Sequence, residues 1–150
     1  MLVILGGLLL LSCTKINVFE KNISFKDHKW PQQVKPSVRF QITDTASLYN
    51  LYVVLRHADA YNYNNIWLKI YTRSPLDSVQ VQPLDLQLAD NRKGWLGTGM
   101  DDIFEHRIRI TNAPIQLRAS GEYVFTFEQI MREDPLQHVL NVGLRVEKVE

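Results

Sequence analysis

From residue 37 onward, apolar and polar residues alternate along the chain in short runs. Successive side chains of a β-strand point to opposite faces, so each run predicts a strand with one buried face. The apolar positions of the runs are Val38, Phe40 and Ile42; Tyr49, Leu51, Val53 and Leu55; Ile66, Leu68 and Ile70; Val79 and Val81; Leu84, Leu86 and Leu88; Ile108 and Ile110; Tyr123, Phe125 and Phe127; and Val142, Leu144 and Val146.

Segments rich in Gly, Pro, Asn, Asp and Ser separate these runs, and no amphipathic helix lies between them. Only Glu128–Leu140 lacks the strand pattern, and Pro135 predicts a long loop or a single helical turn there. The pattern therefore predicts an all-β fold, an antiparallel β-sandwich of about eight strands. A jelly-roll order of the strands is compatible with it, because periodicity does not determine strand order.

The first eleven residues contain no polar side chain. Met1–Leu11 is too short to span a membrane, which takes about 20 residues, but it has the length of the apolar core of a secretory signal. Leu10-Leu11-Ser12-Cys13 resembles the bacterial lipobox, in which a small residue precedes the cysteine that receives the lipid. We predict a lipoprotein signal peptide at residues 1–12, with cleavage between Ser12 and Cys13 and lipid attachment at Cys13.

The charged leader expected before such an apolar run is missing, because the first charge is Lys15; we expect the leader to be truncated. The alternative is that Met1–Leu11 forms a core strand or helix and that Cys13 is a buried thiol. Residues 13–36 contain five lysines and two prolines, and predict the lipidated cysteine and a polar tether. One short strand is expected in it, around Val18–Phe19 or Ile23–Phe25. The sandwich domain is then expected at residues 37–150.

Charge and chemistry exclude several classes of protein. Lys plus Arg number 17 against 16 Asp plus Glu, so the chain lacks the basic excess of a nucleic-acid-binding protein. A lone cysteine cannot form an intramolecular disulfide. We expect no catalytic residues, no cofactor, no metal and no small-molecule substrate, because the sequence offers no set of acid, base, nucleophile and metal ligands. Each histidine stands alone, without the spacing of a zinc site, and is expected at the surface or in a capped position. The histidines are His28, His57, His106 and His138.

A series of distinctive stretches follows nearly the whole chain in order. The most specific is Gly94-Trp95-Leu96-Gly97-Thr98-Gly99-Met100-Asp101-Asp102-Ile103. The others are the lipobox at Cys13, Leu48–Arg56, Tyr61–Leu68, Leu88–Asp90, Gly121–Arg132 and Val142–Val146. In this order the stretches resemble the GldH family of gliding motility lipoproteins from Bacteroidetes.

The resemblance implies a non-enzymatic, lipid-anchored accessory component of gliding motility and of type IX secretion. Its partners would be the membrane, through the lipid, and other gliding or secretion proteins. Thr14-Lys15-Ile16 lacks the acidic run associated with surface export in this phylum, so a periplasm-facing anchor is expected. The choice between inner and outer membrane stays open.

The glycine-rich stretch at residues 94–99 is not a phosphate loop, since no helix or Lys-Ser/Thr pair follows it and two aspartates would repel phosphate. The glycines are expected to provide positive backbone angles or close packing in a bulged hairpin. The alternative is a partner-binding loop. Its candidate residues are Trp95, Gly97, Gly99, Met100, Asp101 and Asp102. Asp101, Asp102 and Glu105 lack the residue pattern of a calcium loop. Glycosidase chemistry needs two carboxylates at a set distance across a sugar cleft, and sequence does not give that distance, so a solvated face or turn is the preferred interpretation.

Aromatic residues are concentrated between residues 49 and 71. Trp67 and Tyr71 share one face of a predicted strand, and if that face is exposed they form a stacking surface for sugars, peptides or protein partners. The alternative is that the rings pack under loops or against the second sheet. A glycan-binding lipoprotein of the cell envelope is therefore the second functional hypothesis.

The lipid-attachment hypothesis makes a direct prediction. Protein extracted from membranes should have the mass of a chain that begins at Cys13 and carries acyl chains. Intact-mass spectrometry measures this, and a Cys13 without acyl chains would contradict the hypothesis.

Overall fold

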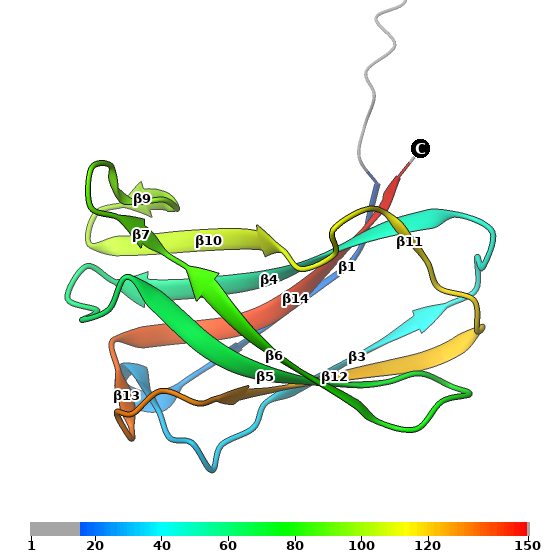
Figure 1. Cartoon of the computed structure of the whole chain (residues 1–150), viewed down its shortest axis with the longest axis horizontal. Helices are drawn as coiled ribbons and strands as arrows, with labels where there is room; N and C mark the ends of the chain where they lie inside the picture. Colours follow the sequence, from blue (N-terminus) through cyan, green and yellow to red (C-terminus); the bar gives the residue numbers. More distant parts are fainter. Residues whose placement is uncertain (1–15, 150) are drawn as a thin grey trace, which may run out of the picture.

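Two β-sheets pack face to face in the computed structural model, which describes residues 16–149 (Figure 1). The larger sheet has the strand order β1-β14-β4-β10-β9, and β11 pairs with β4 beyond β10. The smaller sheet has the order β3-β12-β5-β6. All pairings are antiparallel, so the predicted all-β antiparallel sandwich is confirmed.

The six strands of the larger sheet are β1 (Ile16–Ser24), β4 (Leu48–Ala58), β9 (Thr98–Met100), β10 (Ile103–Arg109), β11 (Ile115–Gln116) and β14 (Val139–Val149). The four strands of the smaller sheet are β3 (Ser37–Ile42), β5 (Asn65–Arg73), β6 (Gln80–Gln87) and β12 (Gly121–Gln129). Short pairs form between β2 (Lys29–Trp30) and β13 (Leu136–Gln137), and between β7 (Ala89–Asp90) and β8 (Gly94–Trp95). A 3-10 turn, η1 (Lys26–His28), precedes β2.

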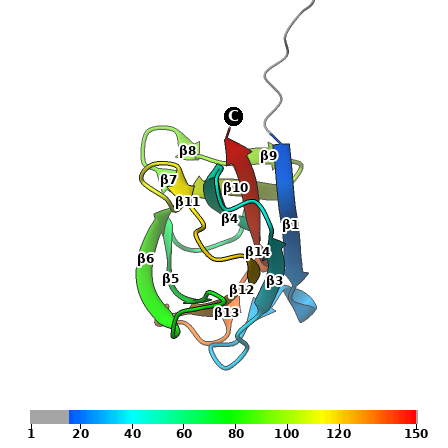
Figure 2. The same ribbon diagram turned by 90° about the vertical axis from the view of Figure 1, so that its right-hand side faces the viewer.

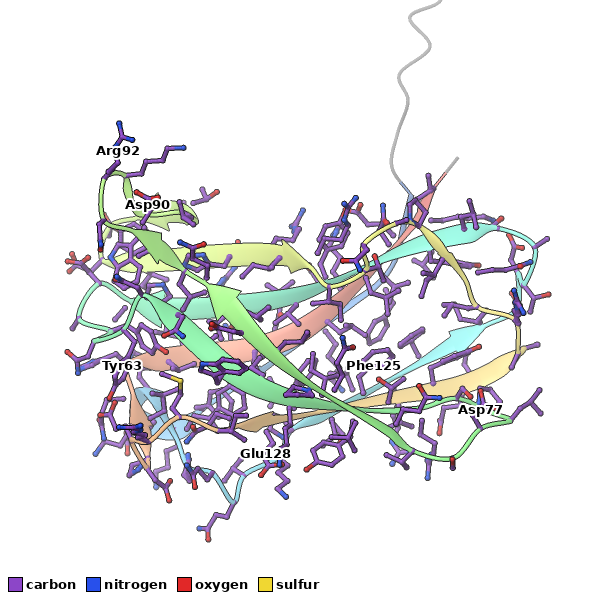
Figure 3. The ribbon with its side chains drawn as sticks, in the orientation of Figure 1. Tyr63, Asp77, Asp90, Arg92, Phe125 and Glu128 are labelled. Carbon is purple, nitrogen blue, oxygen red and sulfur yellow. The ribbon has the colours of Figure 1, made fainter. Side chains whose placement is uncertain are left out.

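The core lies between the two sheets and is formed by the alternating apolar positions of the strands. Ile66 and Leu68 are fully buried, whereas Trp67 between them is 42% exposed, as the alternation in the sequence predicts. Phe40 stacks on Phe125 with ring centroids 5.7 Å apart, and Figure 3 shows Phe125 in the space between the sheets. Burial of such side chains supplies the main stabilising free energy of a domain that has no disulfide in its described part.

The two sheets meet closely along the side that holds β1 and β3 (Figure 2). Phe19 of β1 stacks on Phe40 of β3, with ring centroids 5.3 Å apart. Phe40 also stacks on Tyr123 at 5.5 Å, so the aromatic cluster connects the first strand to the smaller sheet. The first strand is therefore part of the sandwich.

This position of β1 differs from the tether predicted at residues 13–36. Residues 16–24 pair with β14, and Phe25 continues the pairing, its N–H donating to the carbonyl of Leu140 at 2.9 Å. Trp30 is fully buried and stacks on Phe25, with centroids 4.7 Å apart. The short strand expected around Val18–Phe19 is therefore part of a nine-residue strand. Backbone hydrogen bonds to β14 and the stacking of Phe19 on Phe40 hold this polar segment in the sandwich.

A glycine in β14 permits the close approach of β1. Gly143 lies opposite Asn22, and a Cβ atom at Gly143 would collide with the carbonyl oxygen of Lys21 and the side chain of Asn22. No larger residue fits there unless the strands move apart.

The segment Glu128–Leu140, predicted to be a loop or helical turn, is mostly loop but contributes to three strands. β12 continues to Gln129, β13 pairs with β2, and β14 begins at Val139. Gln129 is fully buried and organises the loop: its side-chain amide donates to the carbonyls of Trp30 and Glu133, and its Oε1 accepts the N–H of Met131. These hydrogen bonds from a buried side chain order the loop, although its sequence lacks the alternating pattern of a strand.

Replacing Trp30 by Ala should reduce the free energy of unfolding by about 3–5 kcal/mol, because it empties a fully buried site. The matched control is Trp67→Ala, which removes the same residue type from a partly exposed position and should cost no more than about 1 kcal/mol. Urea denaturation measures both values. Equal, small losses would show that residues 16–36 are a tether after all.

Candidate functional site

The predicted partner-binding residues lie in one region, at the last strand of the larger sheet. β8, β9 and β10 follow one another there, and β9 and β10 form a hairpin, which we call the β9–β10 hairpin (residues 98–109). Met100 is paired with Ile103, so the turn consists of the two residues Asp101 and Asp102. Asp101 has a φ of 55°, a left-handed conformation that aspartate tolerates better than most residues.

Two of the glycines in this segment have distinct structural roles. Gly94 has a φ of 74° and ends the turn that starts at Asp90, whose carboxylate accepts the N–H groups of Arg92 and Lys93. At Gly97, a Cβ atom would collide with the carbonyl oxygen of Glu105, so the chain passes directly over β10. The expected roles of the glycines, positive backbone angles and close packing, are thus both present.

Trp95 holds this segment against the sandwich through a hydrogen bond and ring contacts. Its indole N–H donates to Asp59 Oδ1 at 2.8 Å, and its ring centroid lies 4.3 Å from that of His57. The ring also lies 5.8 Å from Phe104. Trp95 is only partly exposed, and its hydrogen bond and ring contacts are internal, so among the predicted binding residues it positions the others.

The hairpin presents apolar side chains to solvent. Met100 is 78% exposed, and the Ile103 and Leu96 side chains are also exposed. A small hollow of about 270 Å³ lies beside Met100 and Ile103, and Arg56 and Glu105 line it as an ion pair with an N–O distance of 3.7 Å. The structure therefore brings Gly99, Met100, Asp101 and Asp102 together at the hairpin, with Trp95 and Gly97 packed behind them.

Beneath this segment lies a pair of histidines that the sequence predicted to be isolated. That prediction is wrong: His57 and His106 are buried, and their Nε2 atoms lie 2.8 Å apart. His57 Nδ1 lies 2.8 Å from the carbonyl oxygen of Ala58, which can only accept, so Nδ1 carries the proton. His57 Nε2 is then the acceptor, and His106 donates its Nε2–H to it.

Both rings are held in the neutral form. Burial lowers the pKa of His57, and it lowers the pKa of His106 to about 4, with a smaller contribution from the neighbouring His57. Aromatic rings enclose the pair: the centroids of Tyr61 and Phe104 lie 5.2 and 5.9 Å from that of His57. The arrangement suits a packed support for the hairpin and gives a substrate no access to the imidazoles.

Sequence reasoning sought histidines close together along the chain, whereas this pair comes from two strands. β4 and β10 pair so that His57 lies opposite Phe104 and His106 opposite Leu55, which makes the histidines diagonal neighbours. One signal was available: His57 is in phase with Leu51, Val53 and Leu55, the buried face of its strand.

The second candidate site, the aromatic face of the smaller sheet, is less continuous than predicted. Trp67 and Tyr71 both lie on the outer face of β5, but only Trp67 is exposed, and Tyr71 is half-buried. Tyr71 donates its hydroxyl to Glu128, which also pairs with Lys35 at 3.6 Å. The Lys35 ammonium lies 5.8 Å from the centre of the Tyr71 ring. Tyr71 therefore belongs to a polar cluster, and Trp67 stands apart from it.

The remaining predicted residues, Ser12 and Cys13, lie outside the described residues. Within residues 16–149, no group of three or more His, Asp or Glu side chains is placed to hold a metal ion. No helix in that part of the chain is long and apolar enough to cross a membrane.

Comparisons with known proteins agree on one family. A model of the GldH lipoprotein family matches residues 17–146. The chain is 27% identical to the gliding motility lipoprotein GldH of Flavobacterium johnsoniae, over 98% of this chain and 94% of the relative. It is 25% identical to a gliding motility lipoprotein GldH homolog of Christiangramia forsetii, over 91% of this chain and 87% of the relative.

The histidine pair makes stability depend on pH. Because the folded-state pKa of His106 is about 4 against an ordinary value of 6.5, the unfolded chain binds more protons between these pH values. The free energy of unfolding should therefore fall as the pH is lowered from 6.5 to 4, by up to about 3 kcal/mol from this residue.

The measurement compares urea denaturation at pH 7 and pH 4 for the parent, for His106→Gln and for the control His28→Asn, which changes an exposed histidine. The parent and the control should lose more stability on acidification than His106→Gln does. The same loss in all three proteins would contradict a buried neutral pair.

Proposed function

The chain belongs to the GldH lipoprotein family, and we propose that it is a lipid-anchored, non-enzymatic accessory component of the bacterial gliding motility and type IX secretion apparatus. The names of its two relatives support the role in motility. The link to secretion rests on the resemblance of the sequence to the family. In this proposal the protein acts by binding other proteins of the apparatus.

The proposed membrane attachment rests on the lipobox. Residues 1–12 act as the signal peptide, and Cys13 carries the lipid in a periplasm-facing orientation. The family's description as lipoproteins supports this assignment. Anchoring also gives the chain's lone cysteine a role.

The observation that supports a binding role most strongly is the exposure of Met100 on the β9–β10 hairpin. The Met100 side chain is flexible, apolar and 78% exposed, so a partner that covers it would remove most of its surface from water. Ile103, paired with it across the turn, extends the apolar surface, and Asp101 and Asp102 border it with negative charge. We place the partner contact on this hairpin.

The position of β9 suggests how the partner binds. β9 is the last strand of the larger sheet, so one edge of its backbone has no neighbouring strand among residues 16–149. A partner segment in extended conformation can add to such an edge through main-chain hydrogen bonds, with Met100 and Ile103 contacting its side chains. Trp95 and the histidine pair hold the hairpin rigid, which reduces the entropy lost on binding.

Photo-crosslinking tests the contact. A photoreactive phenylalanine analogue at Met100 should cross-link a defined protein in native membranes. The same analogue at Val81, also exposed but on β6 of the other sheet, should not. Mass spectrometry identifies the adducts, and equal patterns at the two positions would reject the hairpin as the binding site.

The role in the apparatus is tested separately. In a gliding host, replacing the chromosomal gene with Met100→Asp should reduce colony spreading and the export of secretion-system cargo, with Val81→Asp as the matched control. Immunoblotting verifies that both variants accumulate to the parental level. Normal spreading and export after deletion of the whole gene would reject the role itself.

A further inference from the structure

A polar hollow of about 540 Å³ lies at one end of the smaller sheet, separate from the β9–β10 hairpin. β5, β6, the short strand β7 and the turn that follows β7 surround it, and Figure 3 labels Asp90 and Arg92 there. The residues that line it are Asn64, Asn65, Asp85, Gln87, Ala89, Asp90, Asn91 and Arg92.

An exposed indole stands next to this hollow. Asn65 is paired with Gln87 and Trp67 with Asp85, so these side chains occupy two adjacent cross-strand rows. All four point to the outer face of the sheet, because the residues between them in sequence, such as Ile66, are buried in the core. Adjacent rows on one face lie about 7 Å apart, close enough for one oligosaccharide to reach both.

The lining restricts the chemistry of a ligand. Ala89 is its only apolar residue, so the hollow offers no burial to an apolar ligand. Asp85 and Asp90 outweigh Arg92 in charge, which disfavours phosphate and other anions. The groups that remain are amides and carboxylates, and these match the hydroxyls of a neutral sugar, each of which both donates and accepts.

The polar side chains are partly pre-positioned by hydrogen bonds to one another. Asn65 donates its side-chain amide to Asp85 Oδ1 at 2.7 Å, and Asn64 donates to Asn91 Oδ1 at 3.2 Å. The first bond connects β5 to β6. The second connects the loop before β5 to the turn after β7. Fixed groups of this kind lose less entropy when a ligand binds.

We propose that this hollow and Trp67 together bind a neutral oligosaccharide. One pyranose ring stacks its C–H face on the indole of Trp67, and the next ring places its hydroxyls against Asn65, Asp85 and Asn91. Tyr71, the other residue of the predicted aromatic face, is not part of the site because its hydroxyl is bonded to Glu128. The oligosaccharide site is on a different sheet from the proposed protein contact, so the two proposals stand or fall separately.

The test is an NMR titration of the isotope-labelled protein with hexamers of glucose, mannose, galactose and N-acetylglucosamine, each to about 10 mM, a range that detects weak sugar binding. At least one hexamer should shift the indole N–H resonance of Trp67 and the side-chain amide resonances of Asn65 and Asn91. Inorganic phosphate at the same concentration is the comparison probe.

Two variants locate the binding. Trp67→Ala and Asp85→Asn should each weaken it by at least about tenfold, equivalent to about 1.4 kcal/mol. Val81→Ala, on the same outer face of β6 but outside the hollow, should leave affinity unchanged. Asp85→Asn changes an exposed side chain with almost no change in volume, so it tests the polar contacts of the hollow independently of the indole.

Three results would overturn the proposal: no shift with any hexamer, shifts that persist unchanged in both variants, or shifts produced by phosphate in place of the sugars. Loss of the Met100 contact would not affect this outcome. Conversely, a protein that binds no sugar could still contact its partner through the hairpin.

Discussion

The backbone pairing of β14 between β1 and β4 is the constraint on which the larger sheet depends. β14 contacts β1 from Ser24 back to Ile16 and β4 along nearly its whole length. The sheet therefore joins the beginning, the middle and the end of the described chain. Strands so distant in sequence pair only after large loops have closed, and the aromatic stacking of Phe19 on Phe40 then connects this sheet to the smaller one.

The strands with clear alternation could be predicted from the sequence because burial itself creates the pattern. Ile66 and Leu68 face the core and Trp67 faces out, as their spacing indicates. β1 was predicted only as one short strand within a tether, because its apolar residues do not alternate over its full length. Its pairing with β14 and the stacking of Phe19 on Phe40 both depend on residues far away in the sequence. The pattern of alternation cannot show which strands become neighbours, so it also concealed the histidine pair.

The β9–β10 hairpin also combines features that the sequence predicts with features that it does not. The glycines and the exposed Met100 were visible as an unusual stretch of sequence, but the direction of Trp95 was not. Its ring turns inward to His57, and its N–H bonds to Asp59, more than thirty residues earlier in the chain. The hairpin is consequently an exposed strand supported by a buried polar and aromatic cluster. Such a support explains how a short edge strand can remain ordered in the absence of a partner.

The early start of β1 has a consequence for the orientation of the protein. β1 begins at Ile16, and three residues span at most about 11 Å, so a lipid on Cys13 would hold the adjoining end of the sandwich close to the bilayer. The row of paired residues at that end contains Ile16, Lys148 and Tyr49, and the row at the far end contains Ser24, Asn141 and Arg56. The far end, which holds the β9–β10 hairpin, is roughly 26 Å away along β1. A partner bound at the hairpin would then have to lie within about one domain length of the bilayer.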